Sequence, residues 1–360
     1  MVLSLFKKAA KTPAGLDISS DGFILACISE EKGRSCLKNL YSHNFNEEIL
    51  QNGMITKPEL FAESLRKIIE ENNLNLKKVN LSVSSSNMFI KTVSFPDLPE
   101  EEIRVIAPQE ASKHISQTVN QINVDFELLE DTKKDNKVDV ILCALSKDIS
   151  KNLADSVAMA GLEINALEAS SFSMIRTLAN AEKINNPDFV YVCVLMEDEN
   201  TDISIIKKGM PVFSNHVQIG KKHIVESFMK GFEIAYEEAN NRLPYFGLLL
   251  PGSEGSSDPD FNKASNLMRP HYSNISAEIQ KTIEFYNSQS EENIGIEKII
   301  LGGRGVCIQN VDKYISNKLK IQTELCNSLE NIVCNPDTAQ KFPANIPVLA
   351  VSVGLALYPA

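Results

Sequence analysis

The order of predicted strands and helices at the start of this chain of 360 residues recurs in its second half. The first copy runs through "AGLDISS", "FILACISEE" and "SCLKNLYSHNF", then an amphipathic helix within "TKPELFAESLRKIIEENNL" and the strand "KKVNLSVSSS". The second copy is a three-strand meander, "FVYVCVLMEDENTDISIIKKGMPVFSNHVQIG", followed by a helical pair in "HIVESFMKGFEIAYEEANNRL". An internal repeat of this kind predicts two similar α/β lobes that face each other.

Local signals define the elements of the first lobe. A Lys-Gly-Arg turn between two apolar runs predicts an antiparallel hairpin. Thr56 as N-cap and Pro58 in the first turn predict the start of the helix. Its buried face is predicted from the spacing of Leu60, Phe61, Leu65, Ile68 and Ile69. The small-residue helix in "IPVLAVSVGLALYPA" is expected to pack back onto this lobe.

A different pattern separates the two copies. It reads as a strand, a Pro-bounded turn, a helix that begins with acidic residues 100–102 and is interrupted or kinked at Pro108, two strands, a helix ended by Gly161 and a last strand. We therefore expect an α+β insertion at 87–165. The first lobe then comprises 1–86, 166–186 and the C-terminal helix 346–360, and the second lobe 187–345, with a helical subdomain at about 221–294.

Charge and composition exclude several classes of protein. The chain has 47 acidic and 36 basic residues, a net charge of −11, which disfavours binding of nucleic acid over a broad surface. A local basic patch at Lys7, Lys8 and Lys11 stays open. No apolar run reaches the length of a membrane span, and "MVLSLF" does not fit a signal peptide, so the cytoplasm is the expected compartment. Seven cysteines without a C-x-x-C pair and five scattered histidines favour buried thiols and argue against a zinc site.

The chain resembles the PilM family, cytoplasmic components of type IV pilus assembly. The segments that carry the resemblance are "GLDISS", "IKTVSFPDLPEEEI", "EASKHI", "INVDFELL", "ISAEIQKTIEFYNSQ", "IEKIILGGRG" and "PVLAVSVGLAL". The resemblance implies an α/β, actin-like (ribonuclease H-like) bilobed ATPase fold with an inserted α+β subdomain. FtsA, the division protein with the same inserted subdomain, is a more distant relative by this interpretation.

In such folds the backbone amides of two β-turns hold the phosphates of a nucleotide, and acidic residues on the adjoining strands hold its metal. Close approach of the backbone to phosphate requires small residues. The resemblance places Asp17 at the first acidic, metal-proximal position and Ser19 and Ser20 in the first turn. Ile24 stands where the family has a basic residue.

The second turn departs further from the family pattern. The usual Asp-Ile-Gly falls on about Leu195, Met196 and Glu197, which would place negative charge against a triphosphate. Thr201 and Asp202 match the far side of the turn. Since no acidic residue on this strand orients water or Mg²⁺, the resemblance implies that ATP and Mg²⁺ can bind but that hydrolysis is slow or absent.

The adenosine-binding turn is better kept. Gly302 and Gly303 follow the strand, Arg304 replaces a small residue and is expected to intrude into the base pocket or stack on the base, and Gly305 follows. Glu238, with Arg242, is a loose match to the acidic and basic pair that contacts ribose.

A structural explanation stays open for each of these motifs. Asp17 with Ser19 and Ser20 also fits a polar hairpin end, and the glycines after residue 301 also fit a tight turn without any ligand. Residues 197–199 fit either a solvated acidic loop or a metal site.

The resemblance also implies a partner. A PilM-like protein is expected to bind the N-terminal cytoplasmic tail of a PilN-like inner-membrane protein in a groove between the insertion and the first lobe, which keeps it peripheral to the membrane. The candidate walls of this groove are Ile103, Val105, Ile106, Ile115 and Phe89, with ordinary core packing as the alternative. The expected function is thus a scaffold of pilus or related secretion machinery. The alternative is an actin-like ATPase or sugar-kinase-type phosphotransferase, and a division-type filament is a third possibility.

Overall fold

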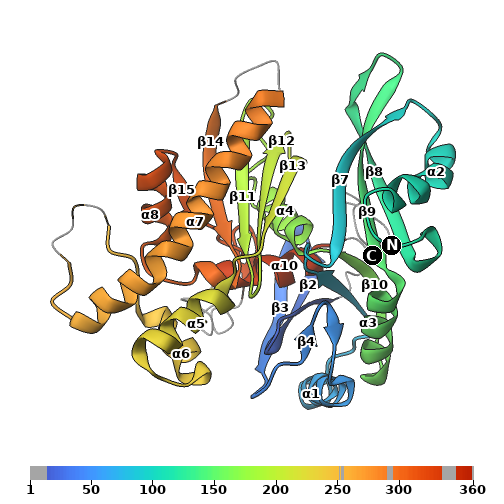
Figure 1. Cartoon of the computed structure of the whole chain (residues 1–360). Coiled ribbons are helices and arrows are strands. Elements are labelled where there is room, and N and C mark those ends of the chain that lie inside the picture. The colour runs from blue at the N-terminus through green and yellow to red at the C-terminus, as the bar shows by residue number, and fades with distance from the viewer. Residues whose placement is uncertain (1–13, 251, 253–254, 290–294, 335–345, 359–360) are drawn as a thin grey trace. The chain divides into compact units, whose positions relative to one another are not determined.

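The computed structural model describes residues 14–250, 252, 255–289, 295–334 and 346–358 (Figure 1). These residues form two compact units. The first unit contains the described residues up to 177 together with 331–334 and 351–358, and the second contains 178–330 and 346–350. No helix in the described part of the chain is long and apolar enough to span a bilayer.

A six-stranded sheet forms the centre of the first unit. Its strands are β1 (Ala14–Ile18), β2 (Gly22–Glu31), β3 (Arg34–Asn44), β6 (Lys78–Val83), β10 (Glu163–Ala169) and β16 (Val333–Cys334). Their order is β10-β6-β1-β2-β3-β16, with antiparallel β1–β2–β3 and parallel pairing at β6, β10 and β16. The turn between β2 and β3 has positive φ at Lys32 and Gly33, 52° and 74°, which confirms the predicted hairpin.

The second unit repeats this sheet topology. Its strands are β11 (Val190–Met196), β12 (Thr201–Lys207), β13 (Met210–Val217), β14 (Ile296–Gly302) and β15 (Thr323–Leu325), in the order β13-β12-β11-β14-β15. The first three are antiparallel, and β14 and β15 add in parallel, as β6 and β10 do in the first unit. The repeat predicted from the sequence is therefore present in the pairing of the strands.

Helices α1 (Pro58–Glu71), α3 (Lys147–Met159) and α4 (Ser170–Asn180), with the small hairpin β4 (Leu50–Gln51) and β5 (Met54–Ile55), complete this part of the first unit. Pro58 lies in the first turn of α1, as predicted, but the N-cap is Lys57. The Thr56 hydroxyl donates to the Ile49 carbonyl, 3.1 Å away, so tertiary pairing takes the group predicted to cap the helix. Gly161, with φ of 83°, follows the end of α3 as predicted.

The C-terminal helix α10 (Ala350–Ala356), which follows the short helix η4 (Ile346–Leu349), packs on β1 as expected. A Cβ added to Gly15 would lie 2.1 Å from the Ser352 carbonyl oxygen, and one added to Gly354 would lie 1.9 Å from that of Ser173. The Asn80 amide donates to the Leu355 carbonyl at 2.9 Å. Gly15 and Gly354 are needed where α10 packs on the first unit, because the two backbones approach too closely to leave room for a side chain.

The insertion of the first unit is a three-stranded antiparallel sheet covered by one helix. It contains β7 (Met88–Pro96), α2 (Glu100–Ser112), η1 (Val119–Gln121), β8 (Ile122–Lys134) and β9 (Lys137–Ser146), with strand order β7-β9-β8. Helix α2 is continuous through Pro108, so the predicted interruption is wrong, and the alternative, a kink at Pro108, stays a prediction. Burial of Ile103, Ala107 and Ala111 against the sheet offsets the local cost of the proline.

Helices of the second unit pack around an apolar core on its sheet. They are α5 (Lys221–Phe232), α6 (Tyr236–Arg242), η2 (Leu243–Tyr245), α7 (Pro259–Gln289), η3 (Arg304–Val306) and α8 (Val311–Leu319). The pair α5 and α6 was predicted, whereas α7 starts 14 residues before the predicted "SNISAEIQ" segment and continues through Pro270. On α7, Ile279 is fully buried while Phe285 is 48% exposed, so Tyr286 is the aromatic residue that packs inward at this turn.

Candidate functional site

The first predicted phosphate turn joins β1 to β2 and is held by internal hydrogen bonds. The Ser19 N–H donates to the Gly22 carbonyl at 2.8 Å, and the Ser19 hydroxyl lies 3.3 Å from an Asp21 carboxylate oxygen. The carbonyls of Ser20 and Asp21 accept the N–H groups of Ile49 and Phe45, at 2.8 and 2.7 Å. The backbone of this turn is therefore fixed on its carbonyl side by the segment that follows β3.

Asp17 is buried at the end of β1, with 2% of its surface exposed. The Ser82 hydroxyl on the neighbouring parallel strand β6 donates to Asp17 Oδ1 at 3.2 Å. Across the described residues, no group of three or more His, Cys, Asp or Glu side chains comes together to hold a metal ion. A metal ion at Asp17 would thus need ligands other than a cluster of these side chains. Metal binding at Asp17 stays a prediction.

The second predicted phosphate turn, residues 197–200, joins β11 to β12 in the second unit. The Glu197 N–H donates to the Asn200 carbonyl at 2.9 Å, which closes the turn. The carbonyls of Glu197 and Asp198 accept the N–H groups of Lys221 and Lys222, at 2.9 and 2.8 Å, in the first turn of α5. The start of α5 thereby gains acceptors for amides that have no partner within the helix.

The glycine turn after β14 packs directly against this second turn. Gly303 has φ of 93°, and its N–H donates to the Pro347 carbonyl at 2.9 Å. A Cβ on Gly303 would lie 2.4 Å from the Met196 carbonyl oxygen and 2.7 Å from Glu197 Oε1, and one on Gly305 would lie 2.3 Å from Cγ of Met196. Close packing inside the protein itself therefore requires these two glycines. This agrees with the alternative interpretation of the glycines as a tight turn that binds no ligand.

Arg304 and Glu197 form an ion pair that bridges the two turns. Their side chains are only 8% and 13% exposed. For Glu197 the interpretation as part of a solvated loop is therefore wrong, whereas the metal-site interpretation stays a prediction. Glu199 does lie in solvent, 49% exposed and 3.6 Å from the Lys222 amine. Sequence analysis missed the Glu197–Arg304 pair because its partners are 107 residues apart, although their opposite charges were visible.

Cys307 lies at the same place, with its thiol 3.6 Å from the Gly303 carbonyl oxygen. Burial raises the pKa of this thiol to about 11, and the positive charges of Lys221 and Arg304 oppose the shift while Glu197 adds to it. Tyr272 from α7 donates its hydroxyl to the Gly305 carbonyl at 2.5 Å, and burial raises the pKa of Tyr272. The end of β14, where Gly302 stands, is thus enclosed by side chains of its own unit.

Glu238, the candidate ribose contact, lies on α6 with 54% of its side chain exposed. Its carboxylate is 3.4 Å from the Arg242 guanidinium, and Arg242 is also 3.7 Å from Asp260 and stacks over the ring of Phe232. The acidic and basic residues predicted to contact ribose therefore bind each other in this structure.

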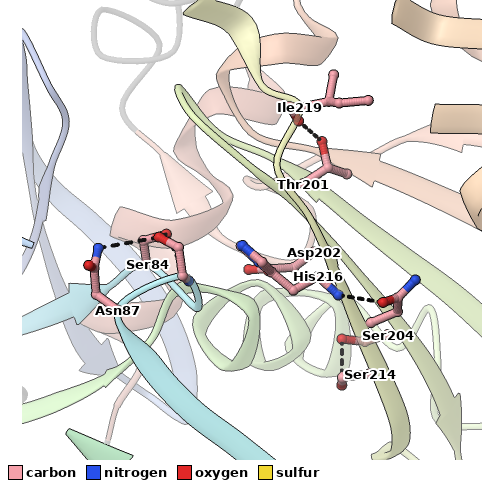
Figure 2. Close-up of polar contacts among 10 residues, drawn as sticks. Ser84, Asn87, Thr201, Asp202, Ser204, Ser214, His216 and Ile219 are labelled. Atoms are coloured by element: carbon pink, nitrogen blue, oxygen red, sulfur yellow. Dashed lines mark hydrogen bonds and ion pairs between the residues drawn. The ribbon is translucent and has the colours of Figure 1, made fainter. Parts of the chain in front are cut away.

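Figure 2 shows a row of cross-strand polar pairs on β12 and β13 that sequence analysis did not identify. Asp202 Oδ1 lies 3.0 Å from His216 Nδ1, and the hydroxyls of Ser204 and Ser214 are 3.1 Å apart. Asp202 and Ser204 are buried although their side chains are polar. The alternation of polar residues at even positions was the available signal, but it fits a solvated strand face equally well.

The candidate partner residues divide between the core and the surface of the insertion. Ile103 is fully buried, and Ile115 and Phe89 are half-buried against the same core, which favours the core alternative for Ile103. The Phe89 ring stacks on His114, with centroids 5.6 Å apart. Val105 and Ile106, in contrast, are 68% and 36% exposed on the outer side of α2. These two residues form an apolar surface that the insertion itself does not cover.

The strand β7 lies at one edge of the sheet of the insertion and pairs with β9 over its whole length. An edge strand can accept a further strand from a partner chain through its outward backbone groups. The insertion thus offers an edge strand, β7, and an exposed apolar pair on α2, a helix that packs over β8 and β9.

Comparison with known proteins agrees with this architecture. A family model described as type IV pilus assembly protein PilM matches residues 15–359. The chain is similar to the solved structure of a PilM-PilN type IV pilus biogenesis complex, with a TM-score of 0.83 and 19% identity over 97% of this chain and 98% of that chain. MreB5 of Spiroplasma citri bound to ADP has a TM-score of 0.52 and 13% identity, over 96% and 95% of the two chains. The ethanolamine utilization protein EutJ from Carboxydothermus hydrogenoformans has the same score and identity, over 99% and 92%. These similarities confirm the predicted actin-like fold.

Proposed function

The chain belongs to the type IV pilus assembly protein PilM family, and from this premise we propose that it is a cytoplasmic scaffold that binds the N-terminal tail of a PilN-like inner-membrane protein. The observation that carries the proposal is the exposure of Val105 and Ile106 on α2 in the subdomain that contains edge strand β7. The similar solved structure is a complex of PilM with PilN, which supports this choice of partner. Association with the membrane then depends on the partner.

The physical basis of tail binding is strand addition and apolar contact. An extended tail gains main-chain hydrogen bonds from an edge strand, and its apolar side chains gain free energy by covering exposed aliphatic groups. The edge supplies affinity with little sequence preference, whereas Val105 and Ile106 select apolar side chains in the tail. The tail needs no catalytic residue in the scaffold, in keeping with a protein that links other components.

The test is binding of a synthetic peptide with the sequence of the partner's cytoplasmic tail. Ile106→Asp places a charge in the apolar surface, and we expect a loss of affinity of at least tenfold, or about 1.4 kcal/mol. The matched control is Tyr245→Asp, which changes an aromatic residue that is 77% exposed in the second unit. Unchanged affinity in a folded Ile106→Asp protein would exclude this surface as the binding site.

For the nucleotide site, we propose a degenerate site with slow or absent ATP hydrolysis. The Glu197–Arg304 pair and the packing of Met196 against Gly303 and Gly305 support this, because they fill the space next to both turns with protein atoms. The residues present do not fit a triphosphate at this second turn. Titration calorimetry with ATP and Mg²⁺ and a phosphate-release assay test the proposal, and micromolar affinity with Mg²⁺-dependent turnover would establish the ATPase alternative instead.

A further inference from the structure

The Glu197–Arg304 pair brings a negative charge to the place where the fold would hold a phosphate. The Glu197 side chain reaches over Gly303, whose added Cβ would come within 2.7 Å of Oε1, while its other oxygen binds the Arg304 guanidinium. Arg304 follows Gly303 directly, at the start of η3. An arginine that is 8% exposed and binds a carboxylate has the donor geometry that also binds phosphate.

Two successive backbone N–H groups of the 197–200 turn share one direction. The carbonyls of Glu197 and Asp198 both point to the first turn of α5, where they accept the N–H groups of Lys221 and Lys222. In a trans peptide the N–H points opposite to the C=O of the same plane. The N–H groups of Asp198 and Glu199 therefore both point away from α5, and successive N–H groups with a common direction form the concave arrangement that binds anions.

We propose that the Glu197 carboxylate is a built-in anion that occupies an anion site formed by Arg304, the glycine turn and the 197–200 turn. The ligand class that this site would take in place of Glu197 is a pyrophosphate group, free or as part of a nucleoside di- or triphosphate. The inference rests on the proposed degenerate nucleotide site and adds its cause, a specific side chain that competes with the ligand.

The competition follows from the tether. A group attached to the site through a short segment acts at a local concentration in the millimolar range or above, so that a free anion must exceed this concentration to displace it. Glu197 also repels an incoming anion through its own charge. Removal of the carboxylate takes away both effects and leaves the positive charge of Arg304 for the ligand.

The experiment measures binding of inorganic pyrophosphate to the full chain by titration calorimetry. We expect the native chain to bind more weakly than about 1 mM and both Glu197→Ala and Glu197→Gln to bind at least tenfold more tightly, with affinity that falls as salt increases. The matched control is Glu284→Ala, which removes an exposed carboxylate on α7, outside the proposed site, and should leave binding as in the native chain. The additional change Arg304→Gln should abolish the gain. Equal binding by the native chain and the two folded Glu197 variants would overturn the proposal.

A second measurement needs no ligand and serves if one variant is too unstable for calorimetry. Cys307 lies beside Gly303 and near both charged groups. In Glu197→Gln we expect iodoacetamide to modify Cys307 at least threefold faster than in the native chain, as located by mass spectrometry, because the thiolate loses a negative neighbour and the turn is no longer held by the ion pair. An unchanged rate at Cys307 would contradict the role of Glu197 as the group that closes this site.

Failure of this inference is distinguishable from failure of the proposed function. Tight ATP binding with turnover by the native chain would refute the degenerate site itself. Weak binding by both the native chain and the Glu197 variants would keep the degenerate site and refute only the built-in anion. Binding of the partner tail is tested on α2 of the first unit and does not depend on either result.

Discussion

Loss of the buried carboxylate of Glu168 should destabilise the first unit strongly. The carboxylate binds Arg176 through two hydrogen bonds, Nη1 to Oε1 at 2.5 Å and Nη2 to Oε2 at 2.7 Å, and it also accepts the Ser173 hydroxyl at 2.6 Å. The side chains of Glu168 and Arg176 are 2% and 7% exposed. Arg176 further donates to the Gly354 carbonyl at 3.1 Å and stacks over the Tyr358 ring. The pair thus ties α4 to the C-terminal segment.

The magnitude follows from the desolvation of the guanidinium. In Glu168→Ala, Arg176 would stay buried without its counter-charge, a change that costs about 3–5 kcal/mol in proteins. For a unit of this size, a loss of 1 kcal/mol lowers the midpoint of thermal unfolding by about 2–4 °C, so we expect a fall of roughly 6–20 °C. Replacing both partners, in Glu168→Leu with Arg176→Met, should cost less than Glu168→Ala alone, because no unpaired charge is then left in the interior.

Urea and thermal unfolding followed by circular dichroism measure these differences, since the chain contains no tryptophan. The matched control is Asp155→Ala, which breaks an ion pair between Asp155 and Lys151 whose side chains are 63% and 75% exposed. We expect no measurable loss of stability there, because solvent screens such a pair. A loss below about 1 kcal/mol in Glu168→Ala, or a double variant less stable than the single one, would refute the desolvation argument.

Two further predictions concern α10 and α7. Gly15→Ala should lower the free energy of unfolding by about 1–3 kcal/mol in urea denaturation, because the added Cβ would meet the backbone of α10. Gly295→Ala, the control, has open space around it and should have no effect. Equal stability of the two variants would contradict the close packing. His271 on α7 lies 2.8 Å from the Ser227 hydroxyl, and burial, aided by the charge of His223, lowers the pKa of His271. Below about pH 6.5 the unfolded chain therefore binds a proton that the folded chain resists, so stability should fall between pH 7 and pH 5, and less so in His271→Gln; parallel pH profiles of the two proteins would refute this.

Short-range signals explain why much of the fold could be predicted. The hairpin at Lys32 and Gly33 and the helix end before Gly161 depend on backbone conformations that a few adjacent residues set. The repeat of meander and helix was readable because each element carries its own hydrophobic period. Where a local signal met a tertiary contact, the contact decided the outcome. Thr56 pairs with Ile49 instead of capping α1, and α2 continues through Pro108 because its apolar face is buried.

The candidate site shows the same division. Family resemblance gave the positions of the turns at Asp17, Glu197 and Gly303, but the interpretation of residues 197–199 as a solvated loop was wrong for Glu197. On α2, the sequence marked Ile103 and Ile106 alike as apolar wall residues, and only packing separated the buried side chain from the exposed one. Helix periodicity identifies an apolar face, but it does not show which apolar residues at the border of that face lie outside the contact with the core and stay exposed.

The sequence by itself determined the repeated sheet topology and the family to which the chain belongs, because these depend on local periodicity and on motifs that stay contiguous along the chain. Only the tertiary structure decided which charges meet. Glu197 and Arg304 lie 107 residues apart, and Glu168 reaches the carbonyl of Gly354 through Arg176. The energy of such pairs depends on distance and on exclusion of water, and neither quantity exists until the chain has folded.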